Sequence, residues 1–137
     1  MARRSPVQRG ILDTSVVIDL EHIDPAELPG EIAISAVTMA ELAAGPHATT
    51  DPDEAARRQD RLQRAEAAFD PLPFDGDAAR AYGRIYAAVV DAGRKARGSR
   101  SVDLMIAATA LASDLPLLTR NLRDFQGLEG LLEIIEV

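Results

Sequence analysis

The sequence has 137 residues, enough for one domain, and its 47% hydrophobic content predicts a packed globule rather than a disordered segment. It contains no cysteine, which excludes disulfide frameworks, thiolate zinc sites and thiol nucleophiles. With only two histidines, any metal site must consist mainly of oxygen ligands, which favours Mg²⁺ or Mn²⁺ over zinc. The net charge of −7 argues against a protein that coats nucleic acid non-specifically, although it leaves room for a local basic strip.

The first residues are not typical of a targeting segment. Residues 1–8 are basic and are expected to form a poorly ordered arm. Asp13 and Asp19 interrupt the apolar stretch that follows, so no signal peptide is expected. The longest uncharged apolar run, residues 104–112, is far shorter than the ~20 residues of a membrane span. The expectation is a soluble cytoplasmic protein.

Residues 10–12 are typical of a short buried strand, and this strand ends on Asp13. Thr14 and Ser15 are natural N-cap residues, so a helix is expected over residues 15–22. In an open α/β sheet, ligands bind beyond the carboxyl ends of the strands, where Asp13 would lie. The alternative is that Asp13 serves only in a turn or a cap.

The remaining elements alternate between strands and helices. Proline-rich and glycine-rich connectors, capping residues and apolar periodicity set their expected bounds. Strands are expected over residues 31–35, 115–119 and 132–137, the last at a sheet edge, with an extended link at 71–74 and a short turn or helical piece at 121–125. Helices are expected over residues 36–44 (capped by Ser35), 52–69, 76–92 (capped by Asp75 and packed through Ala79, Tyr82, Tyr86 and Val89 or Val90) and 101–112. This alternation predicts a single three-layer α/β/α domain over residues 9–137, with a mostly parallel sheet.

Three acidic residues stand within otherwise apolar stretches: Asp13, Glu41 and Asp103. A charge among core residues costs several kcal/mol unless it is paired or bound to a metal. Each has a simpler interpretation, because Glu41 can face solvent and Asp103 can favour a helix N-terminus. Taken together, carboxylates at segment ends on one side of an α/β sheet predict a divalent-cation site, since a cation offsets their repulsion.

Such a site suits phosphodiester hydrolysis, in which divalent cations activate water and stabilise the leaving oxygen. A basic loop precedes Asp103 and is a candidate for holding the phosphate backbone of a substrate. Its cations are Arg94, Lys95, Arg97 and Arg100. The alternative is that this charged loop only contributes to solubility.

Four motifs in order give the chain a resemblance to a known family. They are ILDTS at residues 11–15, SAVTMAEL at 35–42 with Gly45, DLMIAATA at 103–110 and TRNLRDF at 119–125. With these motifs the chain resembles the PIN-domain family, specifically the VapC-type toxins of bacterial toxin–antitoxin pairs. The resemblance runs from about residue 9 to the C-terminus.

The resemblance implies a PIN-like fold and a Mg²⁺- or Mn²⁺-dependent endoribonuclease that cuts structured RNA. It implies that Asp13, Glu41 and Asp103 form a catalytic acidic triad, with Asp13 and Asp103 as direct metal ligands. Ser15 would orient either Asp13 or a bound water. The implied partners are a cognate antitoxin, whose basic side chain would enter the acidic pocket, and a second copy of the chain in a homodimer.

One position departs from the family pattern. Many members carry a fourth acid two residues after the threonine of the last motif, and here that position is Asn121. Asn121 is expected to belong to the catalytic site, but its side chain offers a neutral oxygen, so the sequence leaves open whether one or two metal ions bind. Asp124 lies three residues further on and is either a compensating acid or a local capping residue.

The sequence also bears on three other functions. An aspartyl-nucleophile phosphatase needs a second carboxylate two residues after the first, and Ser15 occupies that position, which excludes it. A non-catalytic PIN-like module that binds RNA or protein is the main alternative. A nuclease that acts on DNA is a further one.

Overall fold

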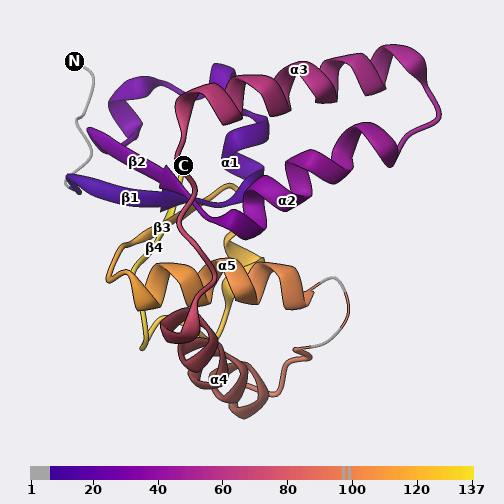
Figure 1. Cartoon of the computed structure of the whole chain (residues 1–137). Coiled ribbons are helices and arrows are strands. Elements are labelled where there is room, and N and C mark those ends of the chain that lie inside the picture. Colours follow the sequence, from indigo (N-terminus) through magenta and orange to yellow (C-terminus); the bar gives the residue numbers. More distant parts are fainter. Residues whose placement is uncertain (1–6, 97, 99) are drawn as a thin grey trace.

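A four-stranded parallel sheet forms the centre of the molecule. The computed structural model describes residues 7–96, 98 and 100–137. The strands lie in the order β2-β1-β3-β4, and every neighbouring pair is parallel (Figure 1). Their bounds are β1 Arg9–Leu12, β2 Glu31–Ile34, β3 Leu117–Thr119 and β4 Ile134–Glu136.

Five α-helices in the described residues connect and flank these strands. They are α1 Thr14–Ile18, α2 Ala36–Ala44, α3 Pro52–Ala68, α4 Gly76–Asp91 and α5 Arg100–Ala112. Short 3₁₀ turns occupy Leu20–His22, Pro25–Glu27, Gly45–His47 and Leu122–Phe125, the last of which we call η4. None of the described helices is long and apolar enough to cross a membrane.

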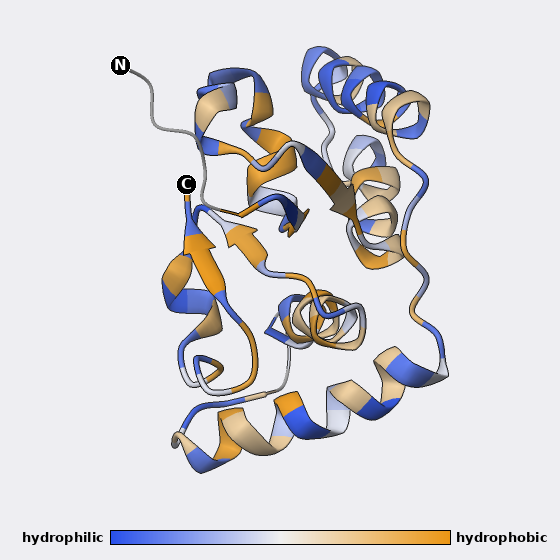
Figure 2. Cartoon of the chain, turned by 90° about the vertical axis from the view of Figure 1, so that its left-hand side faces the viewer, coloured by the Kyte–Doolittle hydropathy of each residue, from blue (hydrophilic) through white to orange (hydrophobic). Residues whose placement is uncertain are grey.

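The two faces of the sheet are buried by different helices. Side chains along a strand alternate between faces, so neighbours point in opposite directions. Ile11 and Leu117 pack with buried residues of α4 and α5, whereas Leu12 and Leu118 pack with those of α1, α2 and α3. Figure 2 shows apolar strands among the helices, of which α3 is largely hydrophilic while the others mix hydrophilic and apolar residues. The expected three-layer α/β/α architecture is confirmed.

Several local expectations are also confirmed. Ser35 accepts a hydrogen bond from the Thr38 N–H and caps α2, and Asp75 accepts one from the Ala78 N–H and caps α4. The strand expected at the C-terminus is the edge strand β4. Of the expected basic arm at residues 1–8, residues 1–6 lie outside the described residues, while the Gln8 carbonyl accepts a hydrogen bond from the Glu31 N–H and so extends the sheet.

The helix expected over residues 15–22 is wrong in its start and its end. Asp13 takes the N-cap position without a capping hydrogen bond, and Thr14 and Ser15 lie inside α1. Their hydroxyls instead bind carboxylates, as described below. The α-helix ends at Ile18, and a 3₁₀ turn continues the chain to His22.

The face expected for α4 is partly wrong. Ala79 is exposed and Val90 is half exposed, because the helix turns a stripe one residue away toward α5. The buried residues of α4 are Ala78, Ala81, Ile85 and Val89. Tyr82 and Tyr86 lie at the edge of this stripe and pack against the core, as expected, with ring centroids 6.2 Å apart.

Candidate active site

Asp13 lies at the carboxyl end of β1 and is only 4% exposed. Two hydroxyl groups donate hydrogen bonds to its Oδ2 atom, from Ser15 at 2.7 Å and from Thr119 at 3.0 Å. Both hydrogen bonds fix the orientation of the carboxylate group. Among the described residues, no hydrogen bond reaches the other carboxylate oxygen, Oδ1, so that atom is left for a ligand.

Strand pairing explains why Thr119 meets Asp13 although 106 positions separate them. The Asp13 N–H donates to the Leu118 carbonyl at 2.8 Å, which aligns the ends of β1 and β3. The backbone after β3 then completes the network. The Arg120 N–H donates to the Ser15 hydroxyl and the Asn121 N–H donates to the Thr119 hydroxyl, at 3.1 and 3.0 Å.

Glu41 reaches the site from α2. Its side chain is exposed, but its Oε1 atom accepts a 2.6 Å hydrogen bond from the buried hydroxyl of Thr14. The Thr14 hydroxyl also lies 3.0 Å from that of Thr38, a fully buried residue of α2. The expectation that Glu41 can face solvent is correct for its exposure. However, a buried hydroxyl group holds its carboxylate in place.

Asp103 lies in the first turn of α5 and is partly buried. The pKa of its carboxyl group is raised from 3.8 to about 7, first by burial and then by the charges of Asp13, Asp124 and Glu41, in that order. The positive charge of the Arg100 guanidinium group lowers this pKa. We refer to Asp13, Glu41, Asp103 and Asp124 as the acidic cluster. Residues from four separate segments of the chain thus act on one another electrostatically at one end of the sheet.

The acidic cluster is an open arrangement. Among the described residues, no three acidic or histidine side chains form a ready-made metal cage. Mg²⁺ normally uses one or two carboxylates and several waters, so an open set of oxygen donors suits it better than a closed one. The donors here are all carboxylate oxygens, and their mutual repulsion at Asp103 would fall on binding a cation.

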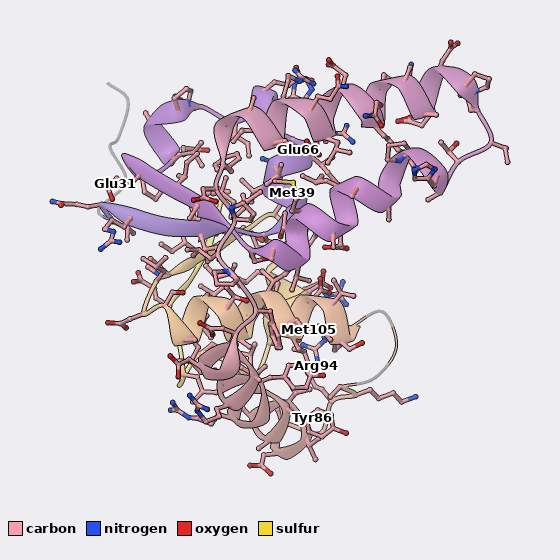
Figure 3. The ribbon with its side chains drawn as sticks, in the orientation of Figure 1. Glu31, Met39, Glu66, Tyr86, Arg94 and Met105 are labelled. Carbon is pink, nitrogen blue, oxygen red and sulfur yellow. The ribbon has the colours of Figure 1, made fainter. Side chains whose placement is uncertain are left out.

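Two arginines of the expected basic loop, Arg94 and Arg100, donate hydrogen bonds to residues in and next to η4. Arg94 donates hydrogen bonds to the Arg123 carbonyl at 2.8 Å and to the Gln126 side chain at 2.9 Å, and Figure 3 shows Arg94 on the side of the molecule formed by α4 and α5. Arg100 donates to the Asp124 carbonyl at 3.2 Å. These contacts assign both side chains a structural role beside the acidic cluster.

The substrate-binding role expected of Arg94, Lys95 and Arg100 stays a prediction, as does that of Ser15. Lys95 is exposed, and Arg97 lies outside the described residues. The Asn121 side chain is exposed at the start of η4 and makes no hydrogen bond within the described residues. Its contribution to the site also stays a prediction.

Sequence reasoning missed two residues that hold the acidic cluster: Thr14, assigned only as a helix cap, and Thr119, noted only within a motif. For Thr119, the order of buried and polar residues in the expected strand was a signal. Thr119 follows the buried pair at residues 117–118, just as Asp13 follows a buried pair at the end of β1. A polar residue in the same place on two adjacent parallel strands predicts a contact at the sheet edge.

The comparison with known families agrees with this geometry. The family model of the PIN domain matches residues 11–130. The chain belongs to the PIN-domain family. The four motifs noted above lie within this match or overlap it, and they carry all four members of the acidic cluster.

Individual relatives place this PIN domain in the VapC ribonuclease family. It is 39% identical to ribonuclease VapC5 of Mycobacterium tuberculosis over 93% of this chain and 95% of that protein, and 36% identical to ribonuclease VapC4 of the same organism over 84% and 88%. Among solved structures, it is similar to VapBC-5 of M. tuberculosis, a member of the VapBC family of toxin–antitoxin systems. That match has a TM-score of 0.84 and 38% identity, and it covers 96% of this chain and 100% of that one.

Proposed function

We propose that the protein is a Mg²⁺- or Mn²⁺-dependent endoribonuclease that acts as the toxin of a toxin–antitoxin pair and cuts a structured RNA. The acidic cluster is the observation that carries this proposal. The charges of Asp13, Glu41 and Asp124 all raise the pKa of Asp103, so four carboxylates share one small region. Relatives of similar length that are named ribonucleases support the choice of RNA as the substrate class.

The donor set fits a hard divalent cation. Asp13 and Asp103 would bind it directly, and Glu41 would bind it directly or through water. Because both hydroxyl donors contact Oδ2 of Asp13, Oδ1 is left for the cation. When bound, the cation supplies a water of lowered pKa and charge stabilisation for the departing oxygen.

The chain's own residues would prepare this chemistry. Ser15 and Thr119 orient Asp13, while Thr14 holds the exposed carboxylate of Glu41. Asp103 must lose its proton before it binds a cation, and a pKa near 7 allows this under neutral conditions. Arg100 lies near enough to lower that pKa, which eases the loss of the proton.

An antitoxin partner follows from the same relatives. The similar structure from M. tuberculosis is described as a toxin–antitoxin system, and we propose a cognate antitoxin for this chain too. Its basic side chain would enter the acidic cluster, where the negative charges attract a guanidinium or ammonium group. The homodimer stays a prediction, which light scattering of the purified protein tests directly.

The decisive experiment compares RNA cleavage by the wild type and by Asp103→Asn. Each protein is incubated with total bacterial RNA in Mg²⁺, in Mn²⁺ and in EDTA. Cleavage that needs the cation and is lost in the variant supports the proposal. Cleavage that persists in EDTA excludes metal dependence, and equal cleavage by the variant excludes the acidic cluster as the site.

The same design separates the alternatives. A non-catalytic module binds RNA or a partner protein but leaves RNA intact in every condition, and its cellular effect survives Asp13→Asn. A DNA nuclease cuts DNA oligonucleotides more rapidly than RNA of the same sequence.

A further inference from the structure

A pocket of about 320 Å³ opens beside the acidic cluster, between α1, α2 and α3. We call it the side pocket. Thr14 and Glu41, which belong to the site described above, form one of its walls. Its volume lies at the lower end of the range for small-molecule sites, roughly 300–1,000 Å³. The side pocket therefore continues directly from the proposed reaction centre and is large enough for a small polar ligand.

Two arginines of α3 also line the side pocket, and they differ in their contacts. Arg58 donates to the Gly45 carbonyl at 2.9 Å and pairs with Glu54 at 3.6 Å, so protein groups already satisfy it. Arg61, one turn further along α3, is partly buried. Within the described part of the chain it makes neither a hydrogen bond nor an ion pair.

A partly buried guanidinium group without a partner among the described residues suits an oxyanion. Arginine binds phosphate through two parallel N–H donors, and this geometry is more specific than that of lysine. The pocket also has an apolar wall. Leu42 is nearly buried, and Ile18 is a 43% exposed large apolar side chain. Phosphate recognition next to an apolar surface is the combination that a nucleotide requires, with the phosphate on the cation and the base on the aliphatic side chains.

We propose that the side pocket holds the nucleotide next to the scissile bond of the RNA, with Arg61 bound to its phosphate. The inference rests on the proposed function, because it assigns a position along the same RNA. Arg61 is a binding residue: it contacts the substrate away from the bond that breaks. Its loss therefore weakens RNA binding more than it slows the chemical step.

The test measures RNA binding in an Asp103→Asn background, which keeps the RNA intact in the presence of Mg²⁺. The probe is end-labelled total bacterial RNA, and retention on a filter is followed as a function of salt. We expect Arg61→Gln to weaken binding about tenfold and to reduce the salt slope by about one. Arg61→Lys keeps the charge and is expected to recover part of the affinity.

Arg64→Gln is the matched control. Arg64 lies one turn beyond Arg61 on α3, pairs with Asp60 at 3.2 Å and lines the neighbouring apolar pocket but not the side pocket. Arg64→Gln removes the same charge from the same helix as Arg61→Gln, and it should leave the RNA affinity within twofold of that of the Asp103→Asn background. A loss equal to that of Arg61→Gln would assign the effect to the overall charge of α3 and would overturn the proposal.

Other results separate the inference from the function it rests on. If Asp103→Asn with Arg61 intact retains no RNA, the proposed function itself fails. If RNA is retained equally with and without Arg61, the side pocket is not a nucleotide site, although the nuclease stands. If Arg61→Gln weakens only the complex with the cognate antitoxin, the pocket belongs to the protein partner, and the proposal is likewise overturned.

Discussion

Thr119 is the residue that links the acidic cluster to the sheet. Its buried hydroxyl donates to Asp13 and accepts the N–H of Asn121. Thr119→Val keeps the shape of the side chain but removes both hydrogen bonds. Since partners of metal ligands commonly contribute 10–100-fold to metal affinity or activity, we expect a loss of that order in cation affinity and cleavage rate.

The control for this substitution is Thr109→Val. Thr109 is equally buried, and its hydroxyl binds the Met105 carbonyl within α5, away from Asp13. The control should cut RNA at the wild-type rate, measured as initial cleavage rate against Mg²⁺ concentration. Equal rates for the two variants would show that Thr119 does not position Asp13.

If Asp103 is a metal ligand as proposed, cation binding should depend on pH. Its pKa of about 7 means that near neutrality about half of the molecules carry a proton on a proposed metal ligand. Cation affinity is expected to rise as the pH increases from 6 to 8, because binding displaces this proton. Mn²⁺ titration by calorimetry measures the effect. Arg100→Gln removes the charge that lowers the pKa, so its affinity profile should move to higher pH.

The same pKa sets the sign of a stability change in the metal-free protein. The folded state holds the Asp103 proton more tightly than the unfolded state, whose pKa is near 3.8. The stabilisation that this proton provides is complete below pH 3.8 and is lost as the pH rises through 7. Asp103→Asn should therefore remove part of the decline in stability between these pH values, as measured by urea unfolding. An unchanged decline would contradict the assignment of the pKa.

At the scale of elements, the contribution of a helix cap to stability can be measured without changing a residue of the acidic cluster. Asp75→Ala removes the side chain that accepts the Ala78 N–H at the start of α4. Loss of such a cap costs about 1 kcal/mol of unfolding free energy. Asp77→Ala removes an exposed ion pair with Arg80 and a first-turn charge but no capping hydrogen bond, and it should cost less. Urea unfolding measures both, and RNA cleavage should be unchanged, since α4 provides no member of the acidic cluster.

The elements also show what the sequence could predict. Capping residues predicted the start of α2 and of α4, because Ser35 and Asp75 act over three residues of local chain. The predictions for the end of α1 and for the buried face of α4 were wrong, because long-range packing decides both features. Likewise, the apolar context of Asp13 and Asp103 predicted a shared site, but Thr14 and Thr119 were missed as positioning residues. Their roles arise from contacts across α2 and β3 that local patterns do not encode.

At the scale of the whole molecule, the proposed cation site would couple cation binding to folding. It joins β1, α2, α5 and η4, which lie far apart in the sequence, so a cation bound there stabilises the folded state against the unfolded chain. At a concentration 100 times its dissociation constant, a ligand of the folded state adds about 2.7 kcal/mol to the unfolding free energy. For a domain of this size, that corresponds to a rise in Tm of about 5–10 °C.

Mg²⁺ or Mn²⁺ should therefore raise the Tm of the wild type, as measured by calorimetric scans with and without the cation. Asp13→Asn keeps a hydrogen-bond acceptor for Ser15 and Thr119 but loses the charge, so its Tm should respond little. Glu31→Gln is the control, because Glu31 begins β2 at the end of the sheet opposite the acidic cluster (Figure 3). Its Tm should rise as in the wild type. An equal rise in Asp13→Asn would mean that the cation binds elsewhere, and the acidic cluster would then have to be explained without a metal.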